Sequence, residues 1–74
     1  MDYRIVAELV GTVHSVPVAV GDAVAAGDTI VILESMKMEI PVLTEIDGVV
    51  GEVSVAAGDN VRDGDVLAVV GPGS

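Results

Sequence analysis

The octapeptide GDAVAAGD at residues 21–28 returns 37 positions later as GDNVRDGD at residues 58–65. Both copies follow the pattern Gly-Asp-x-Val-x-x-Gly-Asp. Glycine adopts positive φ angles without steric cost, and aspartate hydrogen-bonds to nearby backbone groups, so each Gly-Asp pair predicts a tight surface corner. The central valines, Val24 and Val61, are expected to tuck beneath their loops into the core.

The repeat extends well beyond these loops. Residues 7–35 align without gaps onto residues 44–72. Identical pairs outside the loops are Glu8 with Glu45, Gly11 with Gly48, Val13 with Val50, Val16 with Val53 and Val18 with Val55. Two copies are too few for a solenoid, which needs about three repeats to bury a continuous core. We therefore expect a closed, pseudo-twofold pair of half-domains that share one core.

Each copy reads as a strand, a turn-rich loop and a second strand. Valines at alternate positions over residues 16–20 and 53–55 predict half-buried strands. The interval of three at residues 13–16 and 50–53 interrupts this alternation at equivalent places. A β-bulge or a switch of face would account for that interruption.

Further strands complete an all-β domain. The apolar runs at residues 29–33 and 66–70 predict strands covered on both faces, and residues 3–7 and 39–43 bring the total to about eight short strands. Prolines at positions 17 and 41 predict edge strands or bulges. We expect a single domain over residues 1–71 and a flexible tail at residues 72–74.

Composition and charge exclude several functions. The chain has 74 residues, no cysteine and a formal net charge of −9. Three dispersed basic residues cannot displace counterions from a nucleic acid or bind an anionic membrane surface. The acidic surface keeps a valine-rich domain soluble or steers it towards basic partner sites. The chain shows no secretory signal and no apolar run long enough for a membrane span, and we expect it to be cytoplasmic.

Neither a metal site nor a self-sufficient active site is expected. Without cysteine there is no thiolate zinc site or cysteine nucleophile. Calcium needs six to eight converging oxygens from a characteristic acidic loop, which the Gly-Asp pairs do not supply. His14 is the sole histidine, has no evident serine or cysteine partner, and is replaced by Gly51 in the second copy. The sequence thus predicts a protein that is not an enzyme.

The connector between the copies holds the one lysine of the chain, Lys37, between Met36 and Met38. Two strand-like runs joined by a very short link predict a tight hairpin. In a pseudo-twofold domain this connector lies near the symmetry axis and the chain termini lie towards the opposite end. We therefore expect Lys37 at an exposed hairpin tip.

The hairpin link lacks glycine, asparagine and aspartate, the residues that two-residue hairpin turns prefer. Methionine adapts well to a partner surface, so exposed methionines beside Lys37 would favour a recognition role. The alternative is that Met36 and Met38 are buried beneath the turn and Lys37 is an ordinary solvated charge.

The segment Glu34-Ser35-Met36-Lys37-Met38 resembles the biotinyl-domain family, whose motif is usually Glu-Ala-Met-Lys-Met, and Gly48 lies at a typical distance from the lysine. The resemblance implies a flattened β-barrel of two four-stranded antiparallel sheets related by a pseudo-twofold axis. It implies that a biotin protein ligase attaches biotin to Lys37 as an amide, with Met36 and Met38 as flanking recognition residues. The remaining hairpin residues that the resemblance covers are Glu34, Ser35 and Glu39.

The same resemblance implies partners for the chain. It is similar to free-standing biotin carriers, which move carboxyl groups between biotin carboxylase and carboxyltransferase components. Two alternatives stay open. Lipoyl domains share the fold and carry lipoate, but they usually have Asp-Lys-Ala at the tip, so the methionines favour biotin. The other alternative is an unmodified interaction module.

Overall fold

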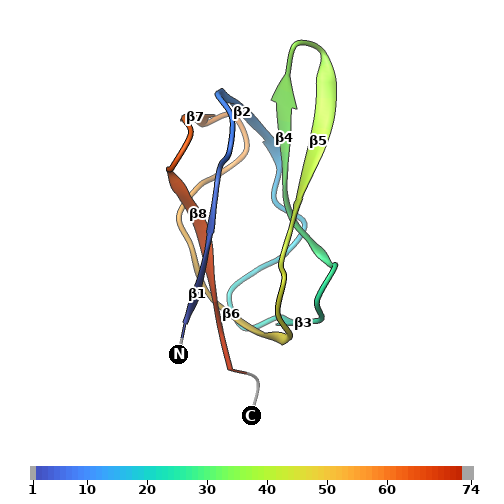
Figure 1. Ribbon diagram of the computed structural model, residues 1–74, viewed down its shortest axis with the longest axis vertical. Coiled ribbons are helices and arrows are strands. Elements are labelled where there is room, and N and C mark those ends of the chain that lie inside the picture. The colour runs from blue at the N-terminus through green and yellow to red at the C-terminus, as the bar shows by residue number, and fades with distance from the viewer. Residues whose placement is uncertain (1, 73–74) are drawn as a thin grey trace.

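The computed structural model describes residues 2–72 and shows an all-β domain with no helix in that range (Figure 1). Two four-stranded antiparallel sheets form the domain, as predicted. The strands are β1 (Tyr3–Val6), β2 (Gly11–Ser15), β3 (Ala23–Val24), β4 (Thr29–Ser35), β5 (Met38–Leu43), β6 (Gly48–Val53), β7 (Asn60–Val61) and β8 (Val66–Gly71). Within residues 2–72 nothing has the length and apolarity of a membrane-spanning helix. Of the predicted tail, residues 73–74 lie outside the described residues.

The two halves of the chain interlock. One sheet has the strand order β1-β8-β6-β3 and the other β5-β4-β2-β7. The offset of 37 residues relates β1 to β5, β2 to β6, β3 to β7 and β4 to β8, and exchanging these partners converts one order into the other. Loop hydrogen bonds follow the same offset: the N–H of Ala7 donates to the Asp65 carbonyl at 2.9 Å, and that of Thr44 to the Asp28 carbonyl at 3.0 Å. Each sheet thus takes two strands from each half, and neither half has a core of its own.

The Gly-Asp pairs form corners, as predicted. In each pair the glycine has a φ between 95° and 98°. Each aspartate carboxylate accepts the N–H of the residue three positions earlier at 2.9 Å; the acceptors are Asp22, Asp28, Asp59 and Asp65. Val24 and Val61 are buried between the corners. These carboxylates therefore serve turn geometry.

The core lies between the two sheets and is aliphatic. Its members are Ile5, Ala7, Val13, Val24, Ile30, Val31, Leu33, Val50, Val61, Leu67, Ala68 and Val70. The register of β4 against β5 shifts between Thr29 and Val31, so Ile30 is an extra, bulged residue. This bulge lets the consecutive residues Ile30 and Val31 both face the core, whereas Ile32 is only half-buried on the outer face. The prediction that the apolar runs are covered on both faces is therefore wrong in part.

The strands predicted over residues 16–20 and 53–55 are also wrong in part. Strand β2 ends at Ser15 and β6 ends at Val53, and the valines beyond them lie in loops. Proline at position 17 has no N–H to continue the β2 ladder. Val16, Val18 and Val55 still pack against the core, so their alternation reflects burial without strand pairing. Bulges do interrupt β2 at residues 13–15 and β6 at residues 50–52, which confirms that expectation.

Edge strands β1 and β5 line a groove between the sheets. Pro41 lies in β5, an edge strand as predicted. In the groove the Tyr3 hydroxyl donates to Glu45 Oε2 at 3.1 Å. Partial burial raises the pKa of the Tyr3 phenol above its ordinary 10.0, and the hydrogen bond to Glu45 and the charges of Glu45 and Glu8 raise it further. The phenol therefore stays protonated and keeps donating this bond at neutral pH.

Candidate functional site: the lysine hairpin

Strands β4 and β5 form the predicted hairpin, with Ser35 and Met38 as its last paired residues. The link between the strands is Met36-Lys37, and both residues are exposed. The hairpin projects beyond the other strands at one end of the molecule, while both chain ends lie at the other (Figure 1). The structure therefore exposes Lys37 at the hairpin tip, at the opposite end of the molecule from the start of β1 and the end of β8 (Figure 1).

The turn is held in an unfavourable backbone conformation. Met36 has φ 53° and Lys37 has φ 65°, and no other non-glycine residue among those described has a positive φ. Positive φ at both central residues is the geometry of a type I′ turn, which normally selects glycine or asparagine. A residue with a Cβ in this region costs about 1–2 kcal/mol. The Met-Lys dipeptide therefore opposes turn stability, which points to a functional reason for its presence.

The methionines are in solvent and not beneath the turn. Met36 is 90% exposed and Met38 is 59% exposed. The alternative interpretation, in which they are buried for stability, is therefore wrong. Two adaptable apolar side chains flank the Lys37 amine and are free to contact another surface.

Acidic residues lie at the base of the hairpin. Glu34 and Glu39 are directly paired across β4 and β5, and like charges in that position repel. His14 Nε2 lies 3.7 Å from Glu39 Oε2, and both side chains are exposed to solvent, so this contact contributes little to stability. No lysine or arginine forms an ion pair within residues 2–72, so the Lys37 amine has no carboxylate partner there.

Ser35 ties the hairpin to the loop between β1 and β2. Its Oγ donates to the Val10 carbonyl at 3.2 Å. The backbone of Gly11 also lies close to the backbone of Glu34, since a Cβ added to Gly11 would lie 2.7 Å from the Glu34 carbonyl oxygen. Sequence reasoning placed Ser35 in the hairpin but missed Val10. Val10 could have been noticed in the sequence because it differs in character from its counterpart in the second copy, Asp47.

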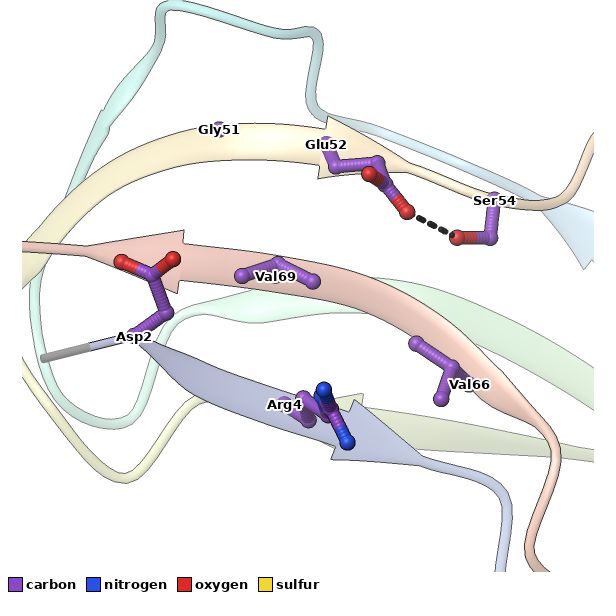
Figure 2. Close-up of a pocket in the computed structure, with 7 residues that line it drawn as sticks. All are labelled: Asp2, Arg4, Gly51, Glu52, Ser54, Val66 and Val69. Atoms are coloured by element: carbon purple, nitrogen blue, oxygen red, sulfur yellow. Dashed lines mark hydrogen bonds between the residues drawn. The ribbon is translucent and has the colours of Figure 1, made fainter.

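Besides the groove between β1 and β5, a concavity lies on the outer face of the sheet that does not contain the hairpin, over β1, β8 and β6 (Figure 2). Val66 and Val69 form its floor, and the hydroxyl of Ser54 donates to Glu52 at 3.0 Å on its rim. Gly51, which occupies the position of His14 in the first copy, is one of its lining residues. Its one cationic residue, Arg4, is not an acylation nucleophile. The lysine hairpin therefore remains the site suited to covalent chemistry.

Two symmetric four-stranded sheets with an exposed lysine at a hairpin tip are the architecture of a cofactor-attachment domain. A family model, Biotin_lipoyl, described as "Biotin-requiring enzyme", matches residues 4–70. The chain belongs to this biotin and lipoyl attachment family.

Two relatives found by sequence similarity are named as biotinylated proteins. The chain is 62% identical over 37 residues to the biotinylated protein TB7.3 homolog of Mycolicibacterium smegmatis. It is 60% identical over 37 residues to biotinylated protein TB7.3 of Mycobacterium tuberculosis. Each match covers 50% of this chain and 52% of the relative, so the aligned part of the chain spans about half the length of these relatives.

Solved structures include carboxylase and lipoyl domains with this fold. A TM-score of 0.91 relates the chain to the urea carboxylase of Kluyveromyces lactis, with 35% identity over 96% of this chain and 6% of that one. A single-chain, multi-domain long-chain acyl-CoA carboxylase gives 0.90, with 32% identity over 99% of this chain and 7% of that one. The lipoyl domain of the Azotobacter vinelandii 2-oxoglutarate dehydrogenase complex gives 0.75, with 31% identity over 95% of this chain and 99% of that domain.

Proposed function

We propose that this chain is a biotin carrier domain and that Lys37 is the residue to which biotin is attached. The observation that carries the proposal is the hairpin tip, where the one lysine of the sequence sits in a strained turn between two exposed methionines. An exposed amine without an ion-pair partner among the described residues is suited to accept an acyl group from an external donor. The similarity to proteins named as biotinylated supports biotin as the group.

The attachment reaction needs an outside enzyme. Nζ of Lys37 attacks the acyl carbon of biotinyl-adenylate, a C–N amide bond forms, and the bond from that carbon to the phosphate oxygen breaks as AMP leaves with the electron pair. Lysine amines are protonated at neutral pH, so the amine must lose its protons to a base. A biotin protein ligase therefore supplies both the base and the activated acyl group.

After attachment the domain acts as a carrier and not as a catalyst. Biotin supplies the chemistry of holding a carboxyl group, while the chain supplies position and recognition. The partners that fit this role are the biotin carboxylase and carboxyltransferase components of a biotin-dependent carboxylase. The high TM-scores with parts of two carboxylases support these partners.

Lipoate is the second candidate group, because a lipoyl domain shares the fold over 99% of its length. Incubation of the purified protein with a biotin ligase, biotin and ATP is expected to add the mass of one biotinyl group. A parallel incubation with a lipoate ligase, lipoate and ATP is expected to add no lipoyl group. Intact-mass spectrometry reads both reactions directly. The opposite pattern would replace biotin by lipoate, and no gain in either would refute a carrier role.

Substituting both methionines, Met36→Ala with Met38→Ala, is expected to leave the fold intact and slow biotinylation. Their exposed side chains contribute little packing in the free protein, so the melting temperature should stay near that of the wild type. Loss of apolar area buried against the ligase should lower kcat/KM by at least about tenfold. Leu43→Ala, at a 45% exposed position distant from the tip, is the control. A large loss of stability in the double variant would instead indicate that the methionines support the fold.

A further inference from the structure

Two equivalent loops differ in how they are held. Residues 7–10 between β1 and β2 correspond, at the offset of 37, to residues 44–47 between β5 and β6. In the second loop, buried Thr44 donates through Oγ1 to the Ile46 carbonyl at 2.9 Å and accepts the Ile46 N–H at 3.3 Å. Asp47 Oδ1 accepts the N–H of Ala26 at 2.7 Å. Two side chains therefore brace the loop at the end of the molecule that holds the termini.

The loop at the lysine end has neither brace. Ala7 replaces Thr44 and has no hydroxyl, and Val10 replaces Asp47 and has no acceptor. Val10 is 69% exposed and lies outside the hydrophobic core and the residues packed against it. Asp47 contributes a hydrogen bond to the folded structure, whereas Val10 exposes apolar surface to solvent. Folding of the free protein does not account for a valine at this position.

The Ser35 bond places Val10 beside the Lys37 turn. Ser35 donates to the Val10 carbonyl, precedes Met36 directly and is paired with Met38 across the hairpin. Val10, Met36 and Met38 are all exposed, and the Ser35 bond holds the backbone of Val10 beside the hairpin tip. We call these three residues the lysine-end surface. Its surroundings are acidic, with exposed carboxylates at Glu8, Glu34 and Glu39.

We propose that Val10 is a specificity-determining residue for the biotin protein ligase, which contacts it when it docks at the lysine-end surface. This inference rests on the proposed function, since it concerns the enzyme that modifies Lys37. The complementary surface on the ligase is an apolar hollow edged by lysine and arginine, because apolar side chains within an acidic rim match that chemistry. Val10 acts in binding, before the acyl transfer step.

The test compares Val10→Ser with Val20→Ser. Val20 is the same residue type at 63% exposure, in the loop that leads to β3 at the opposite end of the molecule (Figure 1). Initial rates of biotinylation by a bacterial biotin protein ligase, measured against carrier concentration, separate KM from kcat. Val10→Ser is expected to raise KM about tenfold, from loss of roughly two buried methyl groups, with kcat and melting temperature unchanged. Val20→Ser and the conservative Val10→Ile should behave as the wild type.

Several outcomes would overturn this inference. If Val10→Ser and the wild type have KM values within twofold, Val10 takes no part in docking, although biotin carriage by Lys37 would stand. If Val20→Ser raises KM equally, or if Val10→Ser lowers kcat together with the melting temperature, the effect is general or structural and the assignment fails. If the wild type itself accepts no biotin, the proposed function and the docking surface fall together.

Discussion

Lys37→Arg is expected to abolish biotin incorporation while leaving the fold unchanged. Arginine keeps the positive charge and most of the length of the side chain, but its guanidinium stays protonated and does not act as an acyl acceptor. The chain has no second lysine to take over. The side chain at position 37 is exposed and makes no ion pair among the described residues, so its exchange removes no packing. Intact mass after ligase treatment measures the loss, and circular dichroism checks the fold.

The matched control for this experiment is the double variant Lys37→Arg with Arg62→Lys. It keeps the composition and net charge of the wild type but moves the lysine to an exposed position in the second Gly-Asp loop. If the hairpin specifies the site, this variant also stays unmodified. Biotin on the relocated lysine would show that the ligase reads exposure alone, and biotin on the single variant would place the attachment elsewhere.

Gly48→Ala is expected to cause a large loss of stability. A Cβ at this buried position would fall on the carbonyl oxygen of Gly71 and lie 2.8 Å from Cγ1 of Val70. The obstructing carbonyl belongs to β8, which pairs with β6, so relief requires the two strands to separate. Overpacking of this kind costs about 3 kcal/mol, which for a small domain lowers the melting temperature by more than about 10 °C.

Gly51→Ala, on the same strand, serves as the control. The nearest heavy atom to its added Cβ is the Val69 carbonyl oxygen at 3.8 Å, an ordinary contact. Thermal unfolding followed by circular dichroism should show Gly51→Ala near the wild type and Gly48→Ala far below it. Equal melting temperatures for the two variants would mean that β6 and β8 are not as close as the structure places them.

Much of the fold could be predicted because it depends on local chemistry. The Gly-Asp corners require only a glycine with positive φ and an aspartate that reaches a backbone N–H three residues away. The hairpin that exposes Lys37 could be predicted because the two apolar runs have too few residues between them for anything but a turn. The valines over residues 16–20 misled prediction because side-chain burial alternates there although the backbone leaves the sheet after Ser15.

The amino-acid sequence alone determined that Lys37 is the single lysine, that it lies between two methionines, and that two similar halves flank it. These are properties of order along the chain, and at the Gly-Asp pairs turn chemistry produces the corners without reference to distant residues. The tertiary structure alone decided how the halves interlock, that Met36 and Met38 stand in solvent, and that Val10 lies beside the turn. Those features depend on contacts between residues far apart in the chain, such as Ser35 with Val10, which no local pattern specifies.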